Sequence, residues 1–144
     1  MDLEAAVVVG ERDRAGAGLV ELSAICEALG QHCASTAMIY AMHLIQVACV
    51  ARHHGGSPLF TAFLAELADQ QLLLGSVTSE VGVGGETRAS IACFSRHEGR
   101  FSVEKEATTI SYGAQADALL LTARASPTAA RNDQALALLR RPDY

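Results

Sequence analysis

The sequence predicts an α+β fold: an N-terminal antiparallel α-helical cluster, residues 1–72, followed by an incomplete antiparallel β-barrel or β-sheet domain, residues 73–144. Two observations predict this division. Apolar residues recur at helical spacing in the first half, whereas after Leu72 they fall into short runs separated by glycine-containing turns. A chain of 144 residues is long enough for one domain or for two small subdomains that share a core.

The first two helices are predicted from periodicity and from their end signals. Residues 1–18 read as a loop that leads into a helix from Leu19 to about Gln31. A second helix is expected to begin at a cap supplied by Ser35 or Thr36 and to end at the paired glycines 55–56, because such pairs terminate helices readily.

The third helix, about Pro58 to Gln71, has a clear start because Ser57 is a favoured cap and proline is favoured at the first helical position. The apolar positions of each helix are expected to face the core of the cluster. These positions are Leu19, Leu22, Ile25, Cys26, Leu29 and Cys33 in the first helix, Met38, Ile39, Met42, Ile45 and Cys49 in the second, and Leu59, Phe60, Phe63, Leu64 and Leu67 in the third.

The second half predicts short strands. An apolar strand ends at Thr78, a hairpin turns within residues 96–100, and a hydroxyl-bearing strand spans residues 108–111. Two further strands, residues 119–122 and 134–139, flank a polar loop that contains proline. Five or six strands of this kind leave open sheet edges, so we expect the chain to be a fragment or a shortened relative of a larger protein.

Composition excludes several classes of function. The net charge is −5 and the eleven Lys and Arg residues are scattered, so we expect no nucleic-acid partner. No charged segment precedes an apolar one at the start, which predicts a cytoplasmic protein without a secretory signal. The apolar residues 34–51 include His43 and Gln46, so we expect a buried helix of a soluble protein and no membrane partner.

Cysteine and histidine residues give no catalytic or metal site. The four cysteines contain no CxxC pair and are expected to be free, buried thiols in a reducing cytosol. A zinc site built from Cys26, His32, Cys33 and His43 lacks supporting spacing beyond the i,i+7 separation of the two cysteines. The five histidines show no nucleophile at meaningful spacing, so we predict no catalytic residue and no metal ligand.

The most informative stretch is residues 72–117. The strand that ends at Thr78 and Ser79 runs into a loop with three glycines at 82, 84 and 85, and the hydroxyl-bearing segment 108–111 follows about thirty residues later. Hydroxyl groups and the backbone N–H groups of a glycine loop can bind an anionic, planar ligand. A glycine loop alone is weak evidence for such a site.

Two segments of this stretch resemble motifs of the acyl-CoA dehydrogenase family. Residues 79–86, Ser-Glu-Val-Gly-Val-Gly-Gly-Glu, resemble the family's Thr-Glu-Pro-x-Ala-Gly-Ser-Asp motif. Residues 109–113, Thr-Ile-Ser-Tyr-Gly, with the pair 116–117, resemble Trp-Ile-Thr-Asn-Gly followed by Ala-Asp. Members have a helical domain, a middle β domain and a C-terminal helical domain, so the resemblance implies that this chain matches the first two in part.

The resemblance implies an FAD site. The residues that it assigns to the cofactor are Ser76, Val77, Thr78, Ser79, Thr109, Ile110 and Ser111. The first strand would lie along the pyrimidine side of the flavin, and Ser111 would take the place of the threonine near its N5 atom. Gly85 stands where a serine contacts cofactor or substrate, so it would contribute through its backbone. Thr109 replaces a tryptophan, which would leave one wall of the pocket smaller and more polar, and Val81 replaces a proline, which would loosen the turn.

The implied reaction is the α,β-dehydrogenation of an acyl-CoA thioester, with an electron acceptor for the flavin and a homo-oligomer when the protein is complete. The family's carboxylate base lies in the C-terminal domain, so the isolated chain is expected to be inactive. Glu80 and Glu86 are expected to be turn or supporting groups, and Glu104 and Glu106 to flank Lys105 on a solvated strand. A flavin monooxygenase on the same scaffold and a non-catalytic remnant or interaction module remain alternatives.

Overall fold

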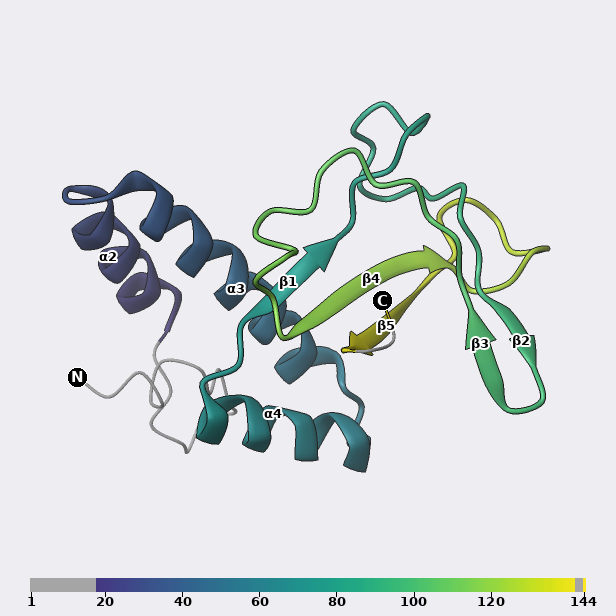
Figure 1. Cartoon of the computed structure of the whole chain (residues 1–144), viewed down its shortest axis with the longest axis horizontal. Helices are drawn as coiled ribbons and strands as arrows, with labels where there is room; N and C mark the ends of the chain where they lie inside the picture. Colours follow the sequence, from purple (N-terminus) through teal and green to yellow (C-terminus); the bar gives the residue numbers. More distant parts are fainter. Residues whose placement is uncertain (1–17, 142–143) are drawn as a thin grey trace. The chain divides into compact units, whose positions relative to one another are not determined.

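The computed structural model describes residues 18–141 and residue 144, and the chain divides into two units. The first unit extends to Leu74 and includes Gln115–Asp117, and the second comprises Gly75–Ala114 and Ala118–Tyr144. The first is helical and the second contains the strands (Figure 1). The predicted loop at residues 1–17 lies outside the described residues.

The helical unit contains three helices among its described residues: α2 (Leu19–Gly30), α3 (Ala34–His53) and α4 (Pro58–Gln70). Helix α3 packs against both α2 and α4. All three predicted helices are therefore present, and α4 begins at the predicted proline. The predicted caps of α3 are wrong, because Cys33 occupies the N-cap position and Ser35 lies within the first turn.

The predicted inner face of α3 is also wrong. The buried residues of this helix are Leu44, Val47 and Val50, whereas Met38 is 61% exposed and Ile45 is 63% exposed. Apolar side chains occur on all sides of α3, so the spacing alone does not select the face that packs. In α2 and α4 the predicted stripes are partly correct, because they include the buried residues Leu22, Phe63 and Leu67.

Helix α3 is long and apolar enough to cross a membrane by length and composition, and only 17% of its most apolar window is buried within the helical unit. A single helix of this kind is weak evidence for a membrane span, because core helices of soluble proteins and signal sequences share these properties. The expectation of a largely buried helix is not met by the described residues.

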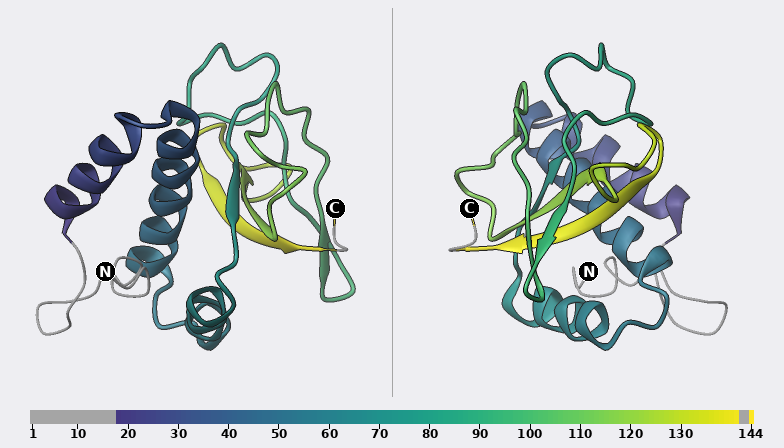
Figure 2. Two further views of the ribbon diagram at one scale, coloured as in Figure 1. Left: turned by 60° about the vertical axis from the view of Figure 1, so that its left-hand side comes forward. Right: turned by 90° about the vertical axis from the view of Figure 1, so that its right-hand side faces the viewer.

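The strands of the second unit form two sheets. The larger has the order β1-β4-β5, with β1 at Leu74–Val77, β4 at Ala118–Arg124 and β5 at Gln134–Arg140. Strands β4 and β5 are antiparallel, with Leu119 opposite Leu139, and Figure 2 shows them side by side. The described residues form open sheets and no closed barrel, as the prediction of an incomplete sheet domain requires.

The smaller sheet is the predicted hairpin, in which β2 (Ser95–His97) pairs antiparallel with β3 (Arg100–Ser102). His97 lies opposite Arg100, so the loop has two residues, Glu98 and Gly99, both with positive φ. This is the backbone of a type I′ turn, whose twist matches that of the flanking strands.

The predicted strand at residues 108–111 is wrong, because this segment has no ladder partner and runs into a turn. The turn includes a hydrogen bond from Gly113 N to Ile110 O at 3.2 Å, and Tyr112 adopts a φ of 45°. The β-forming residues of the segment are therefore overridden by the turn that follows them.

Candidate functional site

The two hydroxyl-bearing segments meet in the second unit. Ser79 Oγ donates a hydrogen bond to Thr109 O at 2.9 Å, across thirty residues of sequence. Next to this contact, Val81 N donates to Glu106 O, also at 2.9 Å. The chain leaving β1 and the segment before residue 109 therefore lie side by side, which brings the two motif-like segments together.

The first predicted segment divides between two faces of β1, because successive side chains of a strand point in opposite directions. Ser76 Oγ and Thr78 Oγ1 lie 3.4 Å apart on one face, and Thr78 is exposed. Val77 is buried on the other face. Ser79 is half-buried, and its hydroxyl donates its proton to the hydrogen bond with Thr109 O. Of the four predicted residues, Val77 can reach a ligand on the hydroxyl face only through its backbone.

The second predicted segment has a different arrangement. Thr109 and Ile110 are exposed, and Thr109 Oγ1 donates to Thr108 O at 2.8 Å. Ser111 is half-buried, and its hydroxyl has no hydrogen-bond partner among the described residues. Ser111 thus retains both its donor and its acceptor capacity for a ligand.

The glycine loop follows β1 with three residues in the left-handed region: φ is 86° at Gly82, 62° at Gly84 and 82° at Gly85. Gly85, the predicted substrate contact, is exposed, and a Cβ atom built there would meet nothing within 4 Å. Its backbone is accessible and its surroundings leave room for a ligand.

A buried charged group lies beneath this loop. Glu80 is 7% exposed and accepts hydrogen bonds from Ser90 Oγ at 2.6 Å, Ile91 N at 3.1 Å and Ala92 N at 2.5 Å. Lys105 Nζ lies 3.7 Å from Glu80 Oε2. Burial raises the pKa of Glu80, but the three hydrogen bonds and the charge of Lys105 outweigh burial and lower the pKa below its ordinary value of 4.5.

Lys105 corrects one sequence-based expectation. Glu104 and Glu106 are exposed as expected, but Lys105 lies outside any strand and its side chain is 2% exposed. Burial lowers the pKa of Lys105, while Glu80 opposes this effect. Sequence reasoning identified Glu80 as a supporting group but did not find its partners, because they lie ten or more residues away.

A largely apolar cleft of about 1010 Å³ lies in the second unit. Val77 and Ile110 are the two predicted cofactor residues at this cleft. The remaining lining residues come from the hairpin, the segment that follows it, β4, β5 and the chain end: Gly99, Arg100, Phe101, Ser102, Val103, Lys105, Leu119, Leu121, Leu138, Leu139 and Tyr144. The hydroxyl groups of the predicted cofactor site are not among the residues that line this cleft.

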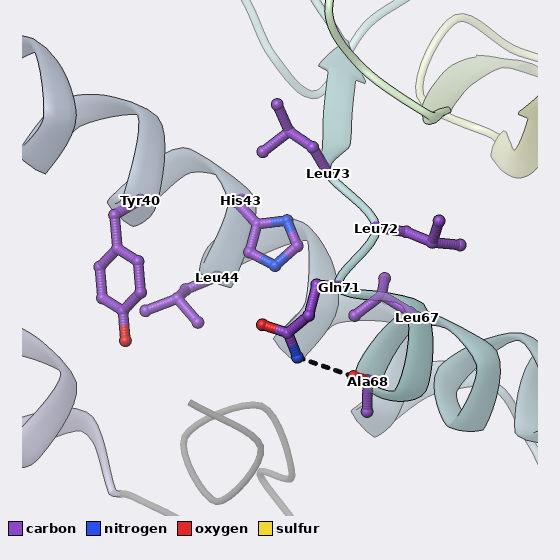
Figure 3. A pocket seen from close by; sticks show the side chains of 8 residues that line it. All are labelled: Tyr40, His43, Leu44, Leu67, Ala68, Gln71, Leu72 and Leu73. Carbon is purple, nitrogen blue, oxygen red and sulfur yellow. Dashed lines mark hydrogen bonds between the residues drawn. The ribbon is translucent and has the colours of Figure 1, made fainter. Parts of the chain in front are cut away.

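A second, smaller cavity of about 170 Å³ lies in the helical unit (Figure 3). His43 Nδ1 accepts a hydrogen bond from Leu74 N at 3.0 Å, and Gln71 Nε2 donates to Ala68 O at 2.8 Å. The buried Tyr40 hydroxyl has no partner among the described residues. Ligand sites for cofactors measure about 300–1,000 Å³, so this cavity is too small for a cofactor.

The described residues contain no group of three or more His, Cys, Asp or Glu residues that could hold a metal ion. The four cysteines are free, as predicted. The expectation that they are buried is wrong, because none of them is fully buried and Cys33 is exposed.

Asp117 anchors the chain immediately before β1. Leu73 N donates to Asp117 Oδ2 at 2.8 Å, and Asp117 N donates to Leu73 O at 2.9 Å. Ala116, its neighbour in the motif-like pair, is fully buried. The end of the second motif-like segment therefore fixes the start of the strand that carries the first.

The fold is the α+β arrangement that the resemblance to acyl-CoA dehydrogenases predicts. Butyryl-CoA dehydrogenase from Megasphaera elsdenii matches with a TM-score of 0.71 at 16% identity, covering 81% of this chain and 31% of that chain. PigA with FAD and proline matches with a TM-score of 0.71 at 21% identity, covering 89% and 34%. The FAD complex of PigA matches with a TM-score of 0.73 at 19% identity, covering 96% and 37%.

The chain thus spans about one third of the length of these solved structures. No family model matches the sequence, and no curated protein matches it. At these identities the likeness establishes the fold and leaves cofactor and reaction to be argued from the site.

Proposed function

We propose that this chain contributes the FAD-binding strands of a flavin-dependent oxidoreductase of the acyl-CoA dehydrogenase type. The observation that carries the proposal is the hydrogen bond from Ser79 Oγ to Thr109 O, which joins the two segments that resemble the family's flavin motifs. The likeness to butyryl-CoA dehydrogenase and to PigA solved with FAD supports it.

The residues at this junction offer hydroxyl groups that support the proposal. The exposed hydroxyl of Thr78 and the unpartnered hydroxyl of Ser111 lie in the two segments that this bond joins. Ser79 gives its proton to Thr109, so in this arrangement it offers a ligand only acceptor lone pairs. We therefore assign donation to the flavin to Ser111 and Thr78, and assign Ser79 to holding the two segments together.

A bound flavin supplies a hydride acceptor, and the residues of this chain bind and orient it. The reaction that we propose is the α,β-dehydrogenation of an acyl-CoA thioester, which would require a base for the α proton in addition to the bound flavin. Glu80 is unsuited to act as this base, because its oxygens accept three hydrogen bonds and its pKa is lowered. We assign no catalytic residue to the described part of the chain.

The experiment is a fluorescence titration of FAD into the purified 144-residue chain. We expect saturable quenching, and Ser111→Ala is expected to weaken binding roughly 2- to 10-fold, the value of one neutral hydrogen bond. Ser95→Ala, at an exposed serine of β2, is the matched control and is expected to leave the affinity unchanged. A folded chain that produces no quenching, or equal affinities for Ser111→Ala and Ser95→Ala, would contradict the proposal.

A further inference from the structure

The buried carboxylate of Glu80 lies at the junction of three parts of the second unit. It occupies the position where the chain leaves β1 and enters the glycine loop. Its hydrogen bonds reach Ser90, Ile91 and Ala92, at the far end of that loop. One side chain therefore closes a loop of about ten residues at its base.

The far end of the loop is itself fixed to β4. Phe94 N donates to Arg124 O at 3.0 Å, and Arg124 N donates to Ala92 O at 2.9 Å. The Arg124 side chain adds a bond from Nε to Ile91 O at 3.2 Å. Glu80 thus connects the exit of β1 to a segment that the sheet already holds.

Lys105 adds a second connection. Its Nζ donates to Thr122 O in β4 at 2.7 Å and to Thr78 O at 3.2 Å, in addition to its ion pair with Glu80. The backbone of Thr78, a predicted flavin contact, is therefore fixed from one side by Lys105. The adjacent Ser79 is fixed from the other side by its bond to Thr109.

The loop between these anchors has little structure of its own. Three of its glycines adopt left-handed conformations, and glycine loses the most conformational freedom on ordering. Its described internal backbone bonds are those from Glu86 N to Val83 O and from Ala89 N to Glu86 O, both at 3.1 Å. Apart from a long hydrogen bond from Gln134 Nε2 to Thr87 O at 3.5 Å, the order of the loop therefore depends on the anchors at its base.

We propose that Glu80, paired with Lys105, is a positioning residue for the flavin site: it closes the glycine loop and holds Thr78 and Ser79 in the conformation that binds the cofactor. The inference rests on the proposed function. It gives Glu80 a role in cofactor binding, although Glu80 would not be found by looking for residues that contact the cofactor. Glu80 acts through the backbone of its neighbours and does not touch the cofactor.

The test compares Glu80→Gln with Glu104→Gln, which neutralises an exposed carboxylate next to Lys105. Glutamine retains the size of glutamate, but its amide NH₂ must face either the Ala92 N–H or the Ile91 N–H, so one backbone donor loses its acceptor. The first readout is hydrogen exchange at the amides of Ile91 and Ala92 in the cofactor-free chain. We expect exchange at one or both to accelerate by at least about tenfold in Glu80→Gln and to be unchanged in Glu104→Gln.

The second readout is FAD affinity together with the absorption spectrum of the bound flavin, measured well below the unfolding temperature. We expect Glu80→Gln to weaken binding by about tenfold and to shift the spectrum towards that of free FAD. If Glu80→Gln does not fold, Ser90→Ala removes one of the three hydrogen bonds and retains both charges, and it is expected to change both readouts in the same direction but less.

Unchanged exchange at both amides would overturn the inference. Accelerated exchange with unchanged affinity and spectrum would also overturn it, because Glu80 would then stabilise the loop without positioning the site. If the unmodified chain does not bind FAD, the proposed function itself fails, and the exchange measurement separately reports whether Glu80 orders the loop.

Discussion

His43 is expected to make the stability of the helical unit depend on pH. Its Nδ1 atom accepts a hydrogen bond from the backbone N–H of Leu74, which is fully buried. Burial lowers the pKa of His43 below its ordinary value of 6.5. The unfolded chain therefore binds a proton at His43 more readily than the folded chain does.

The sign of the effect follows from this difference. As the pH falls below 6.5, the unfolded state takes up more protons, so the free energy of unfolding decreases until the pH falls below the lowered pKa of the folded state. Protonation of Nδ1 also breaks the hydrogen bond that this atom accepts from Leu74 N, and the loss of such a buried bond costs about 1–3 kcal/mol. We expect a decrease of about 1–2 kcal/mol between neutral pH and about pH 5, because His43 is only partly buried.

Urea unfolding followed by circular dichroism at a series of pH values measures this decrease. The informative variant is His43→Asn, because the asparagine side-chain oxygen lies near the position of Nδ1 and accepts a hydrogen bond without titrating. Its free energy of unfolding is expected to be lower at neutral pH, since the smaller side chain enlarges the cavity, but to change less with pH. His97→Gln, at an exposed position, is the control and should retain the pH dependence of the unmodified chain. An equally steep decrease in His43→Asn would refute the reasoning.

Two further predictions concern the backbone of the second unit. Glu98→Asn is expected to raise the free energy of unfolding by about 0.5–1 kcal/mol, because asparagine tolerates the positive φ of the turn position before Gly99 better than glutamate does. Thermal unfolding measures this gain. An equal gain in Glu98→Gln would show that the loss of charge, and not the backbone conformation, is responsible. Gly113→Ala is expected to destabilise by about 1–3 kcal/mol, because its Cβ would lie 2.7 Å from Ile110 Cγ2. The double variant with Ile110→Ala should recover part of that loss in the same assay, and additive losses would contradict the proposed clash.

The start of α4 and the end of α3 could be predicted from the sequence because single residues determine them, whereas the start of α3 could not. Pro58 begins α4, and the paired glycines 55–56 both adopt positive φ just after α3 ends at His53. The packed face of α3 could not be predicted in the same way. Its apolar residues are distributed all round the helix, so the choice of Leu44 over Ile45 depends on where the neighbouring helices lie.

In the second unit, too, a feature that depends on neighbouring residues was predicted correctly, and one that depends on distant strands was not. The hairpin was predicted correctly because Gly99 and the neighbouring polar residues favour a tight turn wherever the rest of the chain lies. The segment 108–111 has strand-forming residues but no ladder partner, since β4 pairs with β1 on one side and β5 on the other. Strand propensity has little effect where no neighbouring strand is available.

The candidate site shows why motif-like residues and structure-determining residues need not be the same. The hydroxyl groups of Thr78 and Thr109 stand out in the sequence. Both residues are exposed, and each hydroxyl makes only a local hydrogen bond, to Ser76 or to Thr108. Glu80 in a run of glycine and serine looks like a surface residue, and only its distant partners make burial of its charge tolerable. A cofactor site on a glycine loop requires both kinds of residue, because contacts made by exposed hydroxyls are productive only when the backbone beneath them is held in one conformation.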